Sequence, residues 1–182
     1  MFINVHELEL HHLEFDQEFQ AGAIELGDDV RQVRPVHTQG RAELVKENHG
    51  GGKIVEDIRL VAKLSTGIEM PCARCLDAVR YNLDRNFDLL YRPLGTDAGH
   101  EELSVTDAEA EIGYYSGDGL LLEEVLREQM LLSVPLKALC REQCKGLCPQ
   151  CGKNLNLETC NCQPHPMDPR WQVLEGLRNK LQ

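Results

Sequence analysis

The positions of the eight cysteines constrain this chain more than any other feature of its sequence. Six of them lie within residues 140–162, and the other two form Cys72-Ala-Arg-Cys75 in the first half of the chain. Two cysteines three residues apart on a tight turn, as in Cys148-Pro-Gln-Cys151-Gly, can both bind one tetrahedral ion at about 2.3 Å. The sequence therefore predicts metal sites. Zinc is the expected ion, with an iron–sulfur cluster and redox disulfides as the alternatives.

Eight thiolates are enough for two closed four-sulfur sites. One division groups Cys72, Cys75, Cys140 and Cys144 around a first ion, and Cys148, Cys151, Cys160 and Cys162 around a second. The rival division makes a single site from Cys144, Cys148, Cys151 and either Cys160 or Cys162. We favour the first division, in which the first site ties two distant parts of the chain together. A closed site has no open position for water, so a hydrolytic zinc is not expected.

The charge of the chain is strongly acidic and unevenly spread. The net charge is −11; residues 1–30 contain eight acids and residues 93–126 nine, and neither stretch has a Lys or Arg. Eight thiolates and two divalent ions would lower the net charge of −11 further, to −15. Such a surface repels phosphate backbones, so it argues against non-specific RNA binding and favours a basic protein partner.

No catalytic or membrane-spanning motif is present in the sequence. It lacks a Gly-x-Ser-x-Gly elbow, a His-Glu-x-x-His zinc motif and a dinucleotide-binding glycine fingerprint, so neither an enzyme nor a small-molecule substrate is expected. No apolar run approaches the roughly 20 residues of a transmembrane helix, and the first residues do not resemble a signal peptide. We therefore expect a cytoplasmic protein without a membrane partner, whose thiols stay reduced and free to bind metal.

Hydrophobic periodicity predicts an α+β fold, with an antiparallel sheet and a packed helix in residues 1–135. Apolar residues alternate through 54–65 and 78–91, which predicts two strands, and weaker patterns place further strands at 33–47 and 110–115. A helix is expected over 120–133, with Asp118 as its N-cap and Pro135 ending it. The connection 66–76 would then carry the first cysteine pair.

Residues 136–182 are predicted to form a separate zinc-binding cysteine module. A last helix would begin at Asp168-Pro169. The basic residues Arg141, Lys145 and Lys153 lie inside the cysteine motifs. They are candidates for contact with RNA or a protein partner; ordinary exposed loop cations are the equal alternative.

The cysteine segment resembles one known family. The residues that carry the resemblance are Pro71-Cys-Ala-Arg-Cys-Leu76, Cys144-Lys-Gly-Leu-Cys-Pro-Gln-Cys-Gly-Lys-Asn-Leu-Asn156, Cys160-Asn-Cys162 and Asp168-Pro-Arg. Together they are similar to the YceD family, whose members are named for accumulation of large-subunit ribosomal RNA. The likeness runs from about residue 30 to the end of the chain.

The resemblance implies a non-enzymatic protein that assists biogenesis of the large ribosomal subunit, and the cysteines add the prediction that it binds zinc. Its partners would be ribosomal RNA, a basic ribosomal protein of that subunit, or both. A thiol redox switch or chaperone-like zinc protein remains the alternative, because Cys160 and Cys162 are close neighbours in the chain.

Overall fold

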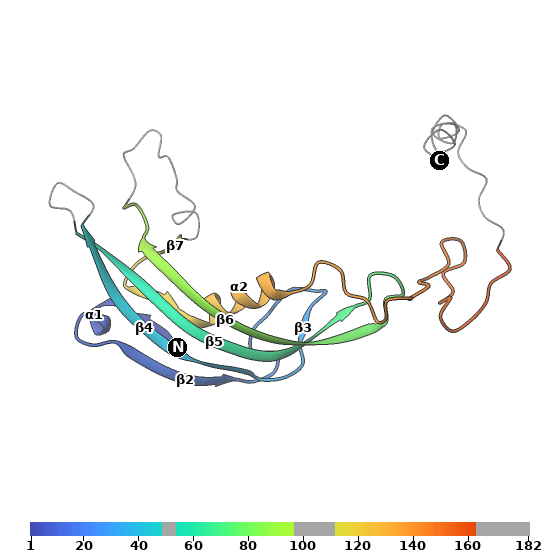
Figure 1. Ribbon diagram of the computed structural model, residues 1–182, viewed down its shortest axis with the longest axis horizontal. Helices are drawn as coiled ribbons and strands as arrows, with labels where there is room; N and C mark the ends of the chain where they lie inside the picture. The colour runs from blue at the N-terminus through green and yellow to red at the C-terminus, as the bar shows by residue number, and fades with distance from the viewer. Residues whose placement is uncertain (49–53, 97–111, 163–182) are drawn as a thin grey trace, which may run out of the picture.

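A long, curved β-sheet is the main element of the fold (Figure 1). This computed structural model describes residues 1–48, 54–96 and 112–162. The strands of the sheet follow the order β2-β4-β5-β6-β7, and β3 also pairs with β5. Their bounds are β2 Leu13–Phe19, β3 Arg31–Gln32, β4 Val36–Asn48, β5 Ile54–Pro71, β6 Ala78–Pro93 and β7 Ile112–Tyr115. The remaining elements are β1 (Phe2–Asn4) paired with β8 (Gly119–Leu121), the short helix α1 (Val5–Leu8) and the helix α2 (Leu122–Ser133).

The central hairpin β5–β6 is longer than the alternation of apolar residues predicts. Its pairing runs from Ile58 opposite Tyr91 to Pro71 opposite Ala78, so β5 continues well past residue 65. Thr66 and Ile68 are buried in this extension, and β3 pairs beside it. The predicted connection 66–76 is therefore wrong in its first half. As a result, the first cysteine pair lies at the tip of a long hairpin.

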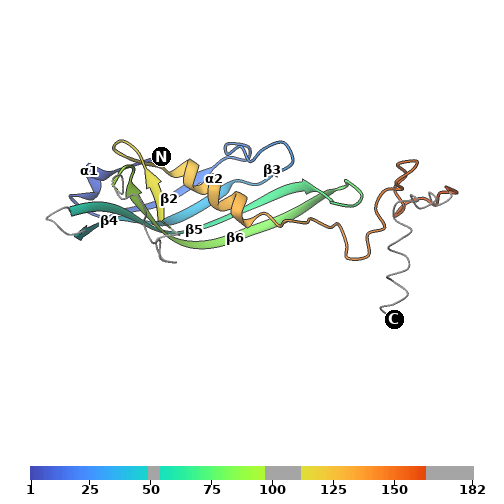
Figure 2. The same cartoon turned by 90° about the horizontal axis from the view of Figure 1, so that it is seen from above.

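Helix α2 lies across one face of the sheet and closes the core (Figure 2). On β5, Ile58, Leu60, Ala62 and Leu64 are buried as the alternation predicts, whereas Ile54 at the start of the strand is exposed. The helix contributes Leu122, Leu126 and Met130 to the same core. The apolar residues that repeat every second position in β5 and about every 3.6 positions in α2 thus pack together in one apolar layer.

The start of α2 differs from the prediction. The N-cap is Leu121, which makes no side-chain capping bond, and the prediction of Asp118 as N-cap is wrong. Strand β8 runs directly into the helix, and the amide of Leu122 donates to the carbonyl of Met1 at 2.9 Å. A distant backbone partner therefore replaces the expected side-chain cap. At the other end the helix stops at Ser133, and Val134 is extended, as a residue before proline should be.

The sheet is mixed and not purely antiparallel as predicted. Strand β7 pairs with β6 in the parallel sense, with Tyr91 opposite Gly113 and Pro93 opposite Tyr115. The connection between these strands exceeds the dozen or so residues that a parallel pair needs. Local alternation reveals a strand but not its direction, which explains the error.

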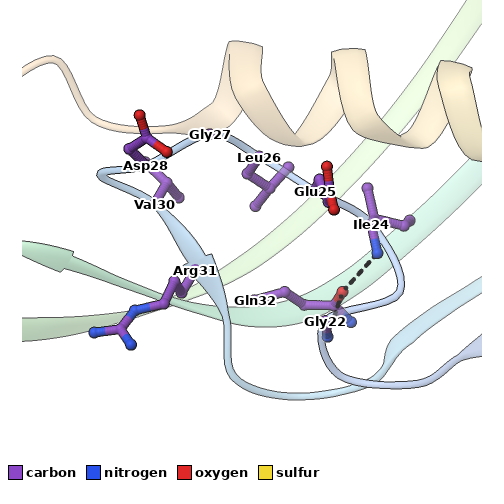
Figure 3. Close-up of a pocket in the computed structure, with 9 residues that line it drawn as sticks. All are labelled: Gly22, Ile24, Glu25, Leu26, Gly27, Asp28, Val30, Arg31 and Gln32. Carbon is purple, nitrogen blue, oxygen red and sulfur yellow. Dashed lines mark hydrogen bonds between the residues drawn. The ribbon is translucent and has the colours of Figure 1, made fainter.

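A buried amide holds the segment that leads into β3. The Gln32 side chain accepts from the amides of Gly22 and Ile24, at 3.0 and 3.2 Å, and donates to the carbonyls of Gln20 and Arg34, at 3.0 and 2.8 Å. Figure 3 shows this side chain beneath the loop. Both halves of the amide are therefore satisfied, as burial requires.

Replacing Gln32 by leucine should lower the free energy of unfolding by about 2–3 kcal/mol, because buried backbone groups would lose their partners. Urea denaturation measures this change. Gln17→Leu, at an exposed position of β2, is the matched control and should stay within about 0.5 kcal/mol of the parent. An equally small effect at Gln32 would contradict the structural role of the amide.

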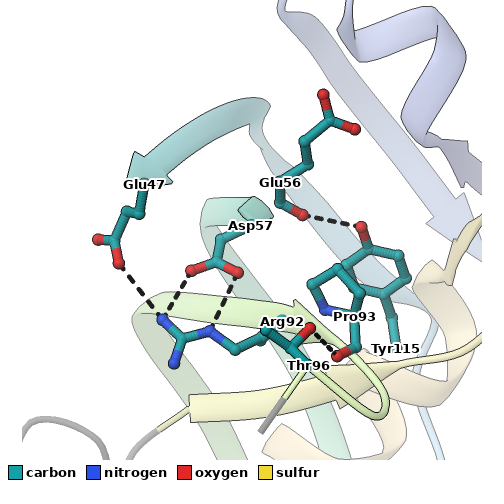
Figure 4. A network of polar contacts seen from close by, with 7 residues as sticks. All are labelled: Glu47, Glu56, Asp57, Arg92, Pro93, Thr96 and Tyr115. Carbon is teal, nitrogen blue, oxygen red and sulfur yellow. Dashed lines mark hydrogen bonds and ion pairs between the residues drawn. The ribbon is translucent and has the colours of Figure 1, made fainter. Parts of the chain in front are cut away.

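A buried ion pair joins β5 to β6 at the ends of these strands that lie away from the hairpin tip (Figure 4). The Arg92 guanidinium donates to both carboxylate oxygens of Asp57, at 3.3 and 3.0 Å, and to Glu47 at 3.3 Å. Asp57 is fully buried and Arg92 is 5% exposed. Beside them the Tyr115 hydroxyl donates to the carbonyl of Glu56 at 2.8 Å, which ties β7 to β5.

Some predicted features lie outside the described residues. They include the C-terminal helix from Asp168 and most of the acidic stretch before residue 112. Among the residues that the structure describes, no helix combines the length and apolar character needed to cross a membrane.

Candidate metal centres

The tip of the β5–β6 hairpin meets the segment after α2 at a first group of four cysteines. The sulfur atoms of Cys72, Cys75, Cys140 and Cys144 all lie within 4.8 Å of one another. The Sγ atom of Cys72 is 3.9 Å from that of Cys144, and the Sγ atom of Cys75 is 3.6 Å from that of Cys140. Four sulfurs at about 2.3 Å around a tetrahedral ion lie about 3.8 Å apart. The group, called site 1 below, therefore has the dimensions of a single tetrahedral metal site.

A tight turn shapes the hairpin tip. The amide of Cys72 donates to the carbonyl of Asp77 at 2.8 Å, and Leu76 takes a left-handed conformation with φ 63°. We call each pair of cysteines three residues apart, with the turn between them, a knuckle: Cys72–Cys75 is the first and Cys148–Cys151 the second. In the second knuckle Gly152 takes the same conformation as Leu76, with φ 72°, directly after Cys151. A residue in this conformation after the second cysteine thus closes both knuckles.

Backbone bonds fix the segment after α2 against this tip. The amide of Ala73 donates to the carbonyl of Ala138 at 2.8 Å. The Arg74 guanidinium donates to the carbonyls of Glu142 and Cys144, at 3.1 and 2.8 Å. Gly146 approaches the tip so closely that a Cβ there would lie 2.9 Å from the Arg74 carbonyl oxygen. Arg74 therefore organises the cysteine segment through its backbone as well as its side chain.

The remaining four cysteines form a second, local group. The sulfur atoms of Cys148, Cys151, Cys160 and Cys162 also lie within 4.8 Å of one another. The amide of Gly152 donates to the carbonyl of Cys148 at 2.9 Å, and the amide of Cys148 donates to the carbonyl of Lys153 at 2.8 Å. This group is called site 2. It is more exposed than site 1, because only Cys148 of its four cysteines is buried, whereas three of the four cysteines of site 1 are buried.

The first cysteine of each knuckle lies among backbone N–H groups. Hydrogen bonds from the amides of Arg74, Cys140 and Cys75 lower the pKa of Cys72 to about 6. Hydrogen bonds from the amides of Cys151 and Gln150 likewise lower the pKa of Cys148 to about 6. In both knuckles, the sulfur of the first cysteine thus accepts hydrogen bonds from the backbone amides of the residues two and three positions later in the chain. This arrangement stabilises a thiolate, which is the form that binds metal.

Other thiols resist ionisation while no metal is bound. A hydrogen bond with Cys151 and local desolvation by neighbouring parts of the chain raise the pKa of Cys162 to about 12. The Asp77 amide lowers the pKa of Cys75, but burial and its hydrogen bond to the Asp77 carboxylate outweigh that effect, and the net pKa is raised. Because a bound ion would have to displace these protons, we expect its affinity to rise with pH.

The structure groups the sulfurs as in the first of the two divisions weighed from the sequence. Cys144 lies with Cys72, Cys75 and Cys140 and not with Cys148 and Cys151. That these eight residues bind metal stays a prediction, although their number, type and spacing fit two tetrahedral ions.

The three candidate contact residues lie on the surface of the cysteine segment. Arg141, Lys145 and Lys153 are all exposed. Lys153 lies 3.3 Å from Glu158, in a pair that is more than half exposed on both sides. Solvent screens such a pair strongly, so it contributes little to the stability of the segment.

Sequence reasoning missed two asparagines next to site 1. The Asn156 amide donates to the Cys144 sulfur at 3.3 Å. Burial raises the pKa of Cys144, but hydrogen bonds from Asn156 and from the Gly146 amide outweigh it and lower the pKa. Asn154 donates to the Asp77 carboxylate at 3.2 and 3.4 Å. The only available signal was the polar run Lys-Asn-Leu-Asn after Cys151-Gly152.

Comparison with known proteins places this arrangement in a family. The chain is 25% identical to YlbN of Bacillus subtilis over 95% of its own length and 92% of that protein. It is 34% identical to Mb2951c of Mycobacterium bovis over 57% of the chain, and spans 47% of that relative. It is 25% identical to the Arabidopsis thaliana chloroplastic protein "Large ribosomal RNA subunit accumulation protein YCED homolog 1" over 69% of the chain, and spans 46% of that relative.

No solved structure matches the chain. The model of one protein family, "Large ribosomal RNA subunit accumulation protein YceD", matches residues 60–178. This range includes the whole of both cysteine groups and well over half of the sequence. The chain therefore belongs to the YceD family.

Proposed function

We propose that this protein is a non-enzymatic factor that helps large-subunit ribosomal RNA to accumulate, and that two zinc ions hold its binding surface in shape. The observation that carries the proposal is the pair of four-sulfur groups within the range that matches the family. The printed name of the Arabidopsis relative supplies the link to ribosomal RNA. In bacteria the large subunit assembles in the cytoplasm, which is therefore the proposed site of action.

Zinc is the ion that fits the ligands best. Four soft thiolates at tetrahedral spacing favour Zn²⁺ over the hard ions that prefer oxygen. In a four-iron cluster each cysteine binds a different iron, so its sulfurs spread more widely than around a single ion. The sulfur distances of 3.6 and 3.9 Å at site 1 support a single ion.

The cysteine segment needs such an ion because it has almost no core of its own. Within residues 136–162, all of which the structure describes, the buried residues are Ala138, Cys144, Gly146 and Cys148. The sheet has a separate and much larger apolar core. Structural zinc can contribute on the order of 10 kcal/mol to folding, which is enough to replace the missing burial.

The charges favour a partner that is bound at the cysteine end of the molecule. Arg141, Lys145 and Lys153 are exposed there, and they offset the charge of −2 that each four-thiolate site would carry. The acidic remainder of the chain repels RNA and would hold a basic ribosomal protein or discourage non-specific binding. We propose that the cysteine segment contacts ribosomal RNA or such a protein.

This function is tested with a charge-neutral variant, Arg141→Gln/Lys145→Gln/Lys153→Gln, in cells that lack the protein. Sedimentation of the tagged chain with large-subunit particles, and the ratio of large- to small-subunit ribosomal RNA, are measured at several salt concentrations. The wild type should co-sediment and restore the ratio, whereas the variant should do neither. If RNA is the partner, the salt dependence of residual binding should also fall by about one unit of slope per lost contact.

The matched control removes three positive charges from the sheet, by Arg41→Gln/Lys46→Gln/Lys63→Gln, and should behave like the wild type. If loss of the protein leaves the ratio unchanged, the proposed function is wrong. If the cysteine-segment variant equals the control, the three basic residues are not the contact.

A thiol redox switch is the second candidate, and the exposure of Cys140 favours it. Its sulfur lies 3.6 Å from that of Cys75. Hydrogen peroxide could take two electrons and two protons from this pair, which would give a disulfide and two molecules of water. Zinc release by mild peroxide, with loss of ribosomal RNA accumulation that reduction reverses, would favour the switch over a static scaffold.

A further inference from the structure

The loop between the two cysteine pairs of site 2 reaches back to site 1. Asn156 lies in this loop, between Cys151 and Cys160, and its side-chain amide donates to the sulfur of Cys144 at 3.3 Å. The carbonyl oxygen of the same side chain accepts from the amide of Lys145 at 2.8 Å. One residue of the site 2 loop thus holds both a site 1 ligand and the backbone that follows it.

Asn154 extends this contact to the hairpin tip. Its carbonyl oxygen accepts from the amide and the side chain of Asn156, at 3.0 and 2.9 Å, and so fixes the orientation of that side chain. Its own amide group donates to the carboxylate of Asp77, two residues after Cys75. The network therefore touches both chain segments that supply the ligands of site 1.

The cysteines of site 2 lie at both ends of this loop. Its two ends are the pairs Cys148/Cys151 and Cys160/Cys162, whose sulfurs lie within 4.8 Å of one another. An ion bound to all four sulfurs would clamp these ends together and fix the loop between them. Without that ion, backbone bonds such as Leu155 to Gly146 and Cys148 to Lys153 would be left to position it.

We propose that Asn156 is a positioning residue that couples the two sites, so that an ion in site 2 holds Asn156 against Cys144 and tightens metal binding at site 1. This inference rests on the proposed metal binding. An N–H donor to a coordinated sulfur spreads the negative charge of a four-thiolate site and fixes the direction of the thiolate. Because coupling is reciprocal, site 1 must strengthen site 2 by the same factor.

Cobalt(II), which reports on four-thiolate sites by its absorption, is the probe for the test. The full chain is titrated with Co²⁺ against a competing chelator in four forms: wild type, Asn156→Ala, Cys160→Ser/Cys162→Ser, and the combination of the two. Each change should weaken site 1 by about 10-fold, the low end of the range for groups that support metal ligands. The combination should weaken it no further, because both changes interrupt the same contact.

Two more variants separate the hydrogen bond from packing. Asn156→Asp has almost the same shape but places a carboxylate beside the sulfur, so it should weaken site 1 more than alanine does. Leu157→Ala, in the same loop and with a side chain that is 80% exposed, should leave the affinity of site 1 unchanged. Circular dichroism of the sheet confirms that each variant remains folded.

The outcomes distinguish the coupling from the metal sites themselves. If the wild type binds no Co²⁺ at either site, the proposed metal binding fails. If the wild type fills both sites but Asn156→Asp keeps wild-type affinity at site 1, the proposed role of Asn156 is wrong. If the losses from Asn156→Ala and from the site 2 variant multiply when combined, the two sites are not coupled through this residue.

Discussion

Replacing Cys72 by serine is expected to release the metal of site 1 and unfold residues 136–147, while the sheet and the local site 2 stay folded. Cys72 is fully buried and belongs to a small cluster with Cys75 and Cys144, separate from the apolar core of the sheet. Loss of a structural ion removes on the order of 10 kcal/mol of folding energy, which this segment cannot recover from apolar contacts. Hydrogen exchange should lose protection in residues 136–147 and keep it in β4, β5 and β6.

The matched control for this experiment is Ala73→Ser. The residue is exposed and lies next to Cys72 in the same turn, so the added hydroxyl leaves the sulfurs in place. It should retain metal and protection. If Cys72→Ser keeps the protection of the wild type in residues 136–147, site 1 does not hold that segment in place.

Replacing Arg92 by leucine should give the second large effect, a loss of about 3–5 kcal/mol in the free energy of unfolding. The cost arises because Asp57, which is fully buried, would keep a charge without its partner. Urea denaturation measures the change. The double variant Asp57→Leu/Arg92→Leu should recover most of the loss, since it leaves no buried charge.

An exposed ion pair of the same sheet provides the comparison. Arg59 donates to Asp88 at 2.9 and 2.7 Å, but both side chains are about half exposed. Arg59→Leu should therefore cost less than about 1 kcal/mol. A similar cost for Arg59→Leu and Arg92→Leu would show that burial does not set the importance of the Arg92 pair.

The strands and the turns between paired cysteines were predictable because local patterns determine them. Alternating apolar residues marked β5 and β6, and the turn between each pair of neighbouring cysteines indicated metal-binding knuckles. The extension of β5 to Pro71 was not predictable, because Thr66-Gly67 resembles a turn until β3 pairs beside it. The division of the chain into residues 1–135 and 136–182 stays a prediction.

Apart from the grouping of Cys72 and Cys75 with Cys140 and Cys144, features that depend on distant partners escaped prediction. Asp118 looked like a helix cap, but Met1 supplies the partner of the first helical amide. The parallel direction of β7 and the pairing of Arg92 with Asp57 join residues that are far apart in sequence. Asn156 is the clearest case, because nothing in the polar run around it indicates a bond to a cysteine twelve residues earlier.

The most direct test of the account is the metal content of the purified protein, followed by limited proteolysis before and after removal of the metal by a chelator. We expect two zinc ions per chain, resistance to cleavage in residues 140–162 while they are bound, and rapid cleavage there once they are removed. Residues 54–93 should stay resistant under both conditions. A metal-free protein whose cysteine segment resists cleavage as well as before would contradict the account.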